Sequence, residues 1–209
     1  MKVTYKLLSK WYDLIDVIYF TKKGNNPRKA ILGQIPKGKV QIVDLCCGTM
    51  ANSIEIAKNR KEAKVLGIDR SSQMLQIART KIQRGEYNNV KIRQGNATKT
   101  GLPAHSVDIV ILGLVLHEME TELAAKILKE AGRLLKEDGT LLVLEWERSN
   151  SLWKRLKFLP IAMIEPKPFR TFFPRKKEEY FRKHGYETKR HITCDYSAVY
   201  VLQRDGEGK

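Results

Sequence analysis

A chain of 209 residues is long enough to bury one substantial core and too short for two independent ones. With 42% hydrophobic and 30% charged residues, its composition is that of a folded globular protein and excludes a disordered chain. No apolar run approaches the roughly 20 residues of a membrane-spanning helix, and the start lacks the cleavage site of a signal peptide. We therefore expect a cytoplasmic protein.

The net charge of +16 is unevenly distributed along the chain. Residues 1–40 carry +7 and residues 148–191 carry +9, whereas residues 41–147 carry only +1. Two basic flanks around a neutral middle indicate an anionic partner, which could be a membrane surface, nucleic acid or an acidic substrate. The alternative is a protein whose surface is simply basic.

Three cysteines, Cys46, Cys47 and Cys194, are too few for a disulfide framework. Adjacent cysteines rarely bridge each other, and no second Cys or His pair stands at zinc-ligand spacing. We expect three buried, reduced thiols and no metal.

The first predicted element is an amphipathic helix over residues 6–20, whose apolar stripe is formed by Leu7, Trp11, Leu14, Ile15 and Ile18. Residues 21–29 read as a loop. Short apolar strands then alternate with helices: strands at 40–45, 64–69, 90–95, 106–116 and 140–146, and helices at 50–60, 71–84 and 121–136. This alternation predicts an α/β fold with a parallel sheet covered on both faces.

After Trp146 the alternation stops. Residues 148–174 mix four prolines with Trp, Phe and many basic residues, and a helix (175–185) and a pair of strands (186–193 and 196–203) follow. We predict a single domain, 1–209, in four parts: an N-terminal helical lid (1–37), a ligand-binding core (38–147), a basic, aromatic insertion (148–174), and a terminal helix and strand pair (175–209).

Two acids follow neighbouring strands of the predicted sheet. Asp44 ends the first strand, and Asp69 ends the second, where an acid is well placed to accept hydrogen bonds from ribose hydroxyls. Alternatively, Asp69 caps the helix that follows, although Ser71 or Ser72 could serve as that cap. Gly48 can adopt a backbone conformation closed to other residues. These residues predict a nucleotide-like ligand at the strand ends.

Four segments in order resemble the class I S-adenosylmethionine-dependent methyltransferases. They are "VDLCCGTM" (43–50), "GIDRSSQMLQIAR" (67–79), "IRQGNATKTGLPAHSVDIVILGLVLHEM" (92–119) and "LKEAGRLLKEDGTLLVLE" (128–145). The opening "SKWYDLID" (9–16) is similar to the start of the ubiquinone- and menaquinone-biosynthesis type. The resemblance implies a Rossmann-like, doubly wound sheet of seven strands, mostly parallel with an antiparallel terminal strand.

The resemblance also implies that S-adenosylmethionine binds across the tips of strands one, two and four. Carried over by position, Asp44, Cys46 and Gly48 belong to the turn at the methionine part, and Asp69 to the ribose. Arg70 and Met74 would flank the adenine, Asn96 and Ala97 would border its amine, and Gly113 would lie near the sulfonium.

The chain departs from the family pattern at three places. Cys46 and Met50 occupy two of the usual glycine positions, Asn96 replaces an acid, and "L-H-E" stands for the frequent "L-H-H". Side chains at the turn obstruct a dinucleotide pyrophosphate more than they obstruct S-adenosylmethionine, which carries no phosphate. The departures therefore disfavour a dehydrogenase, and a homologue that binds no cofactor is a further alternative.

His117 follows the fourth strand and is the candidate catalytic base, with a packing or loop-orienting role as the alternative. Glu118 and Glu145 are weaker candidates, and Tyr12 and Tyr19 could line the acceptor or cover the cofactor.

The basic, aromatic stretch "SLWKRLKFLPIAMI" suits an anionic bilayer, so we expect a small-molecule or lipid-like acceptor, such as a quinone precursor or a phospholipid headgroup amine. The protein would then work partly on the inner face of the membrane. The alternatives are a nucleic-acid methyltransferase, less favoured because no additional binding module is present, and a non-catalytic binding protein.

Overall fold

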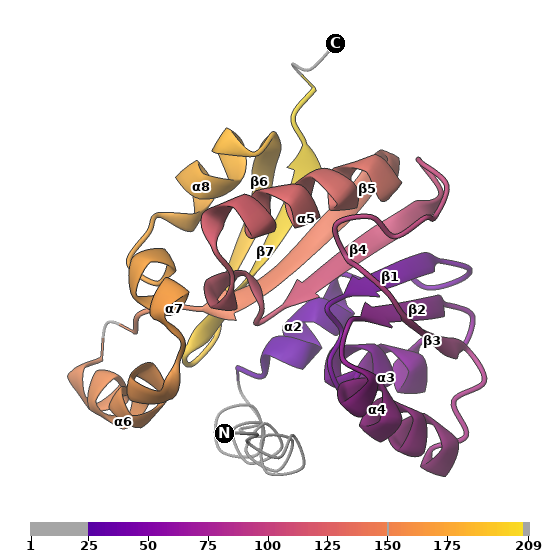
Figure 1. Ribbon diagram of the computed structural model, residues 1–209, viewed down its shortest axis with the longest axis horizontal. Helices are drawn as coiled ribbons and strands as arrows, with labels where there is room; N and C mark the ends of the chain where they lie inside the picture. Colours follow the sequence, from indigo (N-terminus) through magenta and orange to yellow (C-terminus); the bar gives the residue numbers. More distant parts are fainter. Residues whose placement is uncertain (1–24, 150, 207–209) are drawn as a thin grey trace.

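The computed structural model describes residues 25–149 and 151–206, and Figure 1 shows their arrangement. The predicted helix 6–20 and the residues Tyr12 and Tyr19 lie outside this part of the chain. The strands are β1 (Gln41–Leu45), β2 (Lys64–Asp69), β3 (Val90–Gln94), β4 (Val107–Gly113), β5 (Leu135–Trp146), β6 (Tyr186–Thr193) and β7 (Ser197–Arg204). The helices are α2 (Pro27–Gly33), α3 (Ala51–Asn59), α4 (Ser72–Arg84), η1 (Leu116–Glu118), α5 (Thr121–Leu134), α6 (Leu152–Ile164), α7 (Lys167–Phe172) and α8 (Lys177–Lys183).

The strands of the described residues form one seven-stranded sheet in the order β3-β2-β1-β4-β5-β7-β6. The strands β1 to β5 pair in parallel, and β7 pairs antiparallel with both β5 and β6. The predicted doubly wound, Rossmann-like sheet with an antiparallel strand near its end is confirmed. The order reverses at β1 and β4, and ligands of such sheets bind beyond the strand ends at this point.

Both faces of the sheet are buried because side chains alternate along each strand. On β4, Val110 and Leu112 face the core shared with α5 and α8, whereas Ile109 and Ile111 face the core shared with α2, α3 and α4 (Figure 1). The near-continuous apolar runs that predicted the strands follow from this two-sided burial.

Helix α2 was not predicted, since its start falls in the expected loop 21–29. The side chain of Asn26 accepts a hydrogen bond from the Arg28 N–H, and Pro27 occupies the first helical turn. A capping Asn followed by Pro is a strong helix start. Ile31 anchors α2 in the core, so this part of the expected lid belongs to the body of the fold.

Strand β4 ends three residues earlier than predicted. The expected strand ran to Leu116, but Leu114 has a left-handed backbone (φ 54°), and the chain then turns into η1. The Glu145 carboxylate on β5 accepts hydrogen bonds from the N–H groups of Val115 (3.1 Å) and Leu116 (2.8 Å). A contact from a distant strand therefore sets this boundary.

Gly67 on β2 is a site of close approach. A Cβ at this position would lie 2.1 Å from the Met50 sulfur and 2.8 Å from the Cys47 sulfur. We expect Gly67→Ala to lower the free energy of unfolding by about 1–3 kcal/mol through overpacking. Urea denaturation checks this.

The matched control is Gly33→Ala at the end of α2, where a Cβ would meet nothing within 4 Å. That variant should be neutral or slightly stabilising, because Ala restricts the unfolded chain more than Gly does. Equal stability of the two variants would contradict the packing described for Gly67.

Candidate functional site

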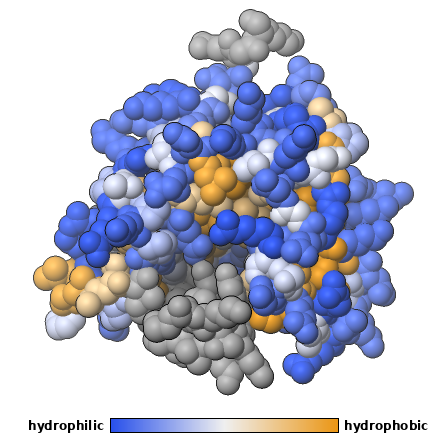
Figure 2. Space-filling model, in the orientation of Figure 1, coloured by the Kyte–Doolittle hydropathy of each residue, from blue (hydrophilic) through white to orange (hydrophobic). Residues whose placement is uncertain are grey.

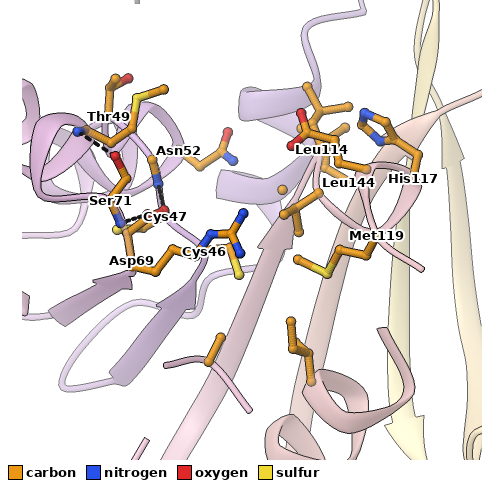
Figure 3. Close-up of a pocket in the computed structure, with 18 of the residues that line it drawn as sticks. Cys46, Cys47, Thr49, Asn52, Asp69, Ser71, Leu114, His117, Met119 and Leu144 are labelled. Atoms are coloured by element: carbon orange, nitrogen blue, oxygen red, sulfur yellow. Dashed lines mark hydrogen bonds between the residues drawn. The ribbon is translucent and has the colours of Figure 1, made fainter. Parts of the chain in front are cut away.

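A cavity of about 960 Å³ opens at the carboxyl ends of β1, β2 and β4. Figure 3 shows its two walls: Cys46, Cys47, Asp69 and Ser71 on one side, and Leu114, His117, Met119 and Leu144 on the other. Its volume lies at the upper end of the range for small-molecule sites, roughly 300–1,000 Å³. The cavity therefore has room for two ligands side by side.

The turn after β1 keeps the shape of a glycine-rich turn with fewer glycines. Cys46 (φ 56°) and Met50 (φ 64°) both adopt the left-handed backbone, and so does Gly48 (φ 52°). An L-residue in this conformation costs about 1–2 kcal/mol. Cys46 and Met50 therefore keep the left-handed backbone that glycine adopts at these positions in the family that this chain resembles. The resulting strain lies beside the cavity, as it often does at functional sites.

Asp69 organises this turn from the neighbouring strand. One carboxylate oxygen accepts from the Gly48 N–H (2.8 Å) and the other from the Ser71 N–H (2.8 Å). The side chain of Ser71, not Asp69, caps α4 by accepting from the Met74 N–H (3.3 Å). Each carboxylate oxygen has a second lone pair, so Asp69 can still accept from a ligand hydroxyl.

The turn is unsuited to a phosphate. Its Gly48 N–H, the type of group that cradles phosphates, is already bonded to the Asp69 carboxylate, whose charge repels an anion. A Cβ at Gly48 would meet nothing within 4 Å, so the backbone there faces open space. An uncharged ribose and a cationic group fit this surface better than a pyrophosphate does.

Nine of the predicted site residues line this one cavity: Cys46, Gly48, Asp69, Arg70, Met74, Asn96, Ala97, Gly113 and His117. They come from the ends of β1, β2, β3 and β4, so the topology brings together what the sequence separates by more than 70 residues. Their individual contacts with a cofactor remain predictions.

Asp44 lies beneath the turn and does not line the cavity. Its side chain is buried and accepts a hydrogen bond from the Ser53 hydroxyl (2.6 Å) on α3. Burial raises the pKa of Asp44 to about 7, and the Ser53 bond partly offsets this rise. Any effect of Asp44 on a ligand would act through the turn above it.

The cysteines are free thiols, with Cys46 and Cys47 half-buried rather than buried as expected. Burial, reinforced by the nearby Asp69 and Asp44, raises the pKa of Cys46 to about 12. Burial raises the pKa of Cys47 further and that of Cys194 to about 11. Protonated thiols are poor nucleophiles, which disfavours a redox role.

His117 on η1 is 1% exposed and sits between two carboxylates. Its Nδ1 lies 2.6 Å from the Glu145 carboxylate, and its Nε2 lies 3.2 Å from that of Glu165. The indole N–H of Trp146 donates to the other Glu165 oxygen (3.0 Å). The Phe169 ring packs edge-on against the imidazole at 5.7 Å between centroids.

These carboxylates decide the charge of the ring. Burial alone would lower the pKa of His117, but the charges and hydrogen bonds of Glu145 and Glu165 outweigh it and raise the pKa to about 10. At neutral pH the ring already holds its proton. This arrangement favours a hydrogen-bond donor over the general base that the sequence suggested.

Glu165 is the site residue that sequence reasoning missed. It follows α6, in a segment for which no element was predicted, and reaches the cavity because α6 and α7 lie beyond the strand ends, with α7 packed against η1 (Figure 1). Its only sequence signal is that it is the single acid between residues 151 and 176, where seven Lys or Arg residues stand.

Within residues 25–149 and 151–206, His117, Glu118 and Glu165 form a group of side chains that could hold a metal ion, since their ligand atoms lie within 4.8 Å of one another. The short bonds of His117 to two carboxylates satisfy both ring nitrogens without an ion. That the protein works without metal stays a prediction.

The two histidines His117 and His184 should titrate on opposite sides of the ordinary histidine pKa of about 6.5. Burial, followed by the charge of Arg175, lowers the pKa of His184. Because the folded pKa of His117 is about 10, its stabilising effect is complete below pH 6.5 and is lost as the pH rises toward 10.

An NMR titration of the imidazole protons checks this. The His117 signal should keep the shift of a charged ring through pH 8, while His184 should lose its proton below pH 6.5. A His117 midpoint near 6.5 or below would contradict the charge assigned to the cluster.

Comparison with known proteins identifies chains that are related to this one. Residues 36–169 match a family model described as a methyltransferase domain. A demethylmenaquinone methyltransferase of Listeria welshimeri is 28% identical over 180 residues, covering 85% of this chain and 69% of that protein. Another, from Geobacillus stearothermophilus, is 31% identical over 141 residues, covering 66% of this chain and 59% of that protein.

The fold has a solved counterpart in the crystal structure of an SAM-dependent methyltransferase from Aquifex aeolicus. The TM-score is 0.73 at 19% identity, over 96% of this chain and 99% of that chain. This likeness shows the shared Rossmann-like fold.

Proposed function

This chain belongs to the methyltransferase domain family and is an S-adenosylmethionine-dependent methyltransferase, and we propose that its acceptor is a small, quinone-type aromatic ring. The observation that supports this acceptor best is the apolar character of the cavity wall that lies opposite the β1 turn. Leu114, Leu144 and Trp146 make that wall apolar, and His117 stands among them. The names of the Listeria and Geobacillus relatives support the same acceptor class.

The residues of the β1–β2 side fit the cofactor, since Asp69 offers lone pairs where ribose hydroxyls would lie and Gly48 leaves open space. S-adenosylmethionine supplies a methyl group on a positively charged sulfur. Since that group is already activated, the protein accelerates the reaction chiefly by positioning the acceptor and excluding water. We propose that Arg70 and Met74 flank the adenine and that Asn96 and Ala97 border its amine.

On the acceptor side, we propose that the His117 imidazolium donates its Nε2–H to the acceptor's phenolic oxygen in place of Glu165, while Glu145 keeps Nδ1. An imidazolium beside a phenolic oxygen stabilises the phenolate and so makes the ring a better nucleophile. Glu145 holds the imidazole through Nδ1. The Nε2 edge of the ring, which is bonded to Glu165 in this structure, is directed at the cavity. The released Glu165 carboxylate would take up the phenolic proton, so His117 aids ionisation while keeping its own proton.

No helix among the described residues has both the length and the apolar character to cross a bilayer. A quinone-type acceptor with an apolar tail partitions into a bilayer. We therefore propose a cytoplasmic protein that meets its acceptor at the inner membrane surface, as the basic flanks of the sequence suggested.

A labelled-methyl assay tests the acceptor class. Wild-type protein should transfer label from S-adenosylmethionine to a short-chain demethylmenaquinol, and not to phosphatidylethanolamine or to transfer RNA. Label in RNA alone would overturn the proposal and return the basic flanks to a nucleic-acid role. Label in the lipid amine alone would leave methyl transfer standing and reject the ring acceptor.

Cofactor binding should depend on the Gly48 backbone and not on the Cys47 thiol. Gly48→Val places a branched side chain on a left-handed backbone and directs it into open space of the cavity, so S-adenosylmethionine affinity should fall at least about tenfold. Calorimetric titration measures this.

Cys47→Ala is the matched control: Cys47 lines the cavity, but its sulfur packs toward Gly67 on β2 and its raised pKa keeps the thiol protonated. Its affinity should stay within about threefold of wild type. A large loss in Cys47→Ala with full binding by Gly48→Val would restore the thiols to a direct role.

A further inference from the structure

The outward face of α6 is apolar although it faces solvent. Leu152, Leu156, Leu159 and Met163 recur at spacings of three and four residues and are 67%, 50%, 52% and 80% exposed. Trp153 beside them is 77% exposed. Figure 2 shows apolar side chains projecting from the lower left, where Figure 1 places α6. A surface helix of a protein that stays in water places such residues inward.

The inward face of the same helix is firmly packed. Phe158 and Ile161 are buried in a cluster with Trp146 and Phe169. The Phe158 ring stacks on Phe173 at 5.5 Å and meets Trp146 edge-on at 5.2 Å between centroids. The fold therefore fixes α6 with its second apolar face directed outward, so this face does not result from an undocked helix.

Positive charge surrounds this face. Residues 151–176 contain seven Lys or Arg residues and one acid, Glu165, which is bonded inward to His117 and Trp146. Arg155 and Lys157 on α6, and Lys167 and Arg170 on α7, are all exposed. Basic groups that rim an apolar face containing Trp and Leu are what the interface of an anionic bilayer attracts.

We propose that the outward face of α6, defined by Leu152, Trp153, Leu156, Leu159 and Met163, docks onto the surface of an anionic lipid bilayer. Trp153 and Met163 enter the headgroup region, and Arg155 and the α7 cations contact lipid phosphates. Charge complementarity distinguishes this occupant from a second copy of the chain. A two-fold contact through α6 would bring the same cations face to face, which is repulsive.

Docking would hold the cavity beside the membrane. Glu165, directly after α6, lines the cavity together with Trp146, which packs on the inward face of the helix. An acceptor with an apolar tail would thus have a short path from lipid to site. The docking surface itself goes beyond the proposed function and stands without it, since lipid binding is measured without methyl transfer.

Co-sedimentation with vesicles of equal parts phosphatidylglycerol and phosphatidylcholine tests the proposal on the full chain. Wild-type protein should sediment with these vesicles and remain in solution with pure phosphatidylcholine. The double variant Trp153→Ser/Met163→Ser should lose at least about tenfold in partitioning, since two exposed apolar side chains no longer enter the interface. Its circular dichroism should match wild type.

Two charge reversals separate local docking from net charge. Arg155→Glu on α6 and Arg79→Glu on α4 change the net charge equally, and both arginines are exposed. Arg155→Glu should weaken vesicle binding severalfold, whereas Arg79→Glu should leave it within about twofold. Equal losses would overturn the α6 surface in favour of diffuse attraction.

Two other outcomes would also overturn the proposal. One is wild-type protein that ignores anionic vesicles. The other is a lipid-free dimer, seen by analytical ultracentrifugation, that Trp153→Ser/Met163→Ser dissociates, which would assign the face to a second copy. Failure of methyl transfer in the acceptor assay, with vesicle binding intact, would leave the docking surface standing.

Discussion

The cavity wall after β4 depends on one buried charge cluster, in which the His117 ring lies between the carboxylates of Glu145 and Glu165. Glu145 also ends β4 by binding the N–H groups of Val115 and Leu116, and Glu165 ties α6 to the sheet through Trp146. Removing one member of such a cluster leaves an uncompensated buried charge, at a cost of about 3–5 kcal/mol. The contacts that set the charge of His117 therefore also hold the loop after β4 and helix α6 in place.

The cofactor side is organised differently, by backbone conformation more than by charge. The left-handed backbones of Cys46 and Met50 show that the turn shape persists without the family's glycines, with the buried Met50 side chain packing into the core as compensation. Asp69 then fixes the turn by accepting the Gly48 N–H. The strained backbone of the turn, and a Gly48 N–H that is already bonded to Asp69, together favour a nucleoside ligand without a phosphate. This physical argument for the cofactor does not depend on the resemblance to the methyltransferase family.

Local patterns predicted most of this fold because both faces of the sheet are buried, which gives continuous apolar strands with clear ends. Helix α4 and its Ser71 cap, strand β2, and the terminal strand pair follow directly from sequence. Two of the misses share a cause, since Glu145 sets the end of β4 and His117 holds Glu165 in place, and both contacts join residues about 30 or more apart. The miss of α2 was local, because the Asn26 cap and Pro27 stand in the sequence. Periodicity carries no information about such contacts, and Tyr12 and Tyr19 stay predictions outside the described residues.

The central claim is that the cavity at the ends of β1, β2 and β4 holds S-adenosylmethionine, with the acceptor against the His117 wall. A crystal structure of the protein with S-adenosylhomocysteine tests it most directly. The account predicts both ribose hydroxyls on the Asp69 carboxylate, the adenine between Met74 and Ala97, and the sulfur near Gly113, facing His117. A nucleoside bound elsewhere, or bound here with its ribose away from Asp69, would contradict it.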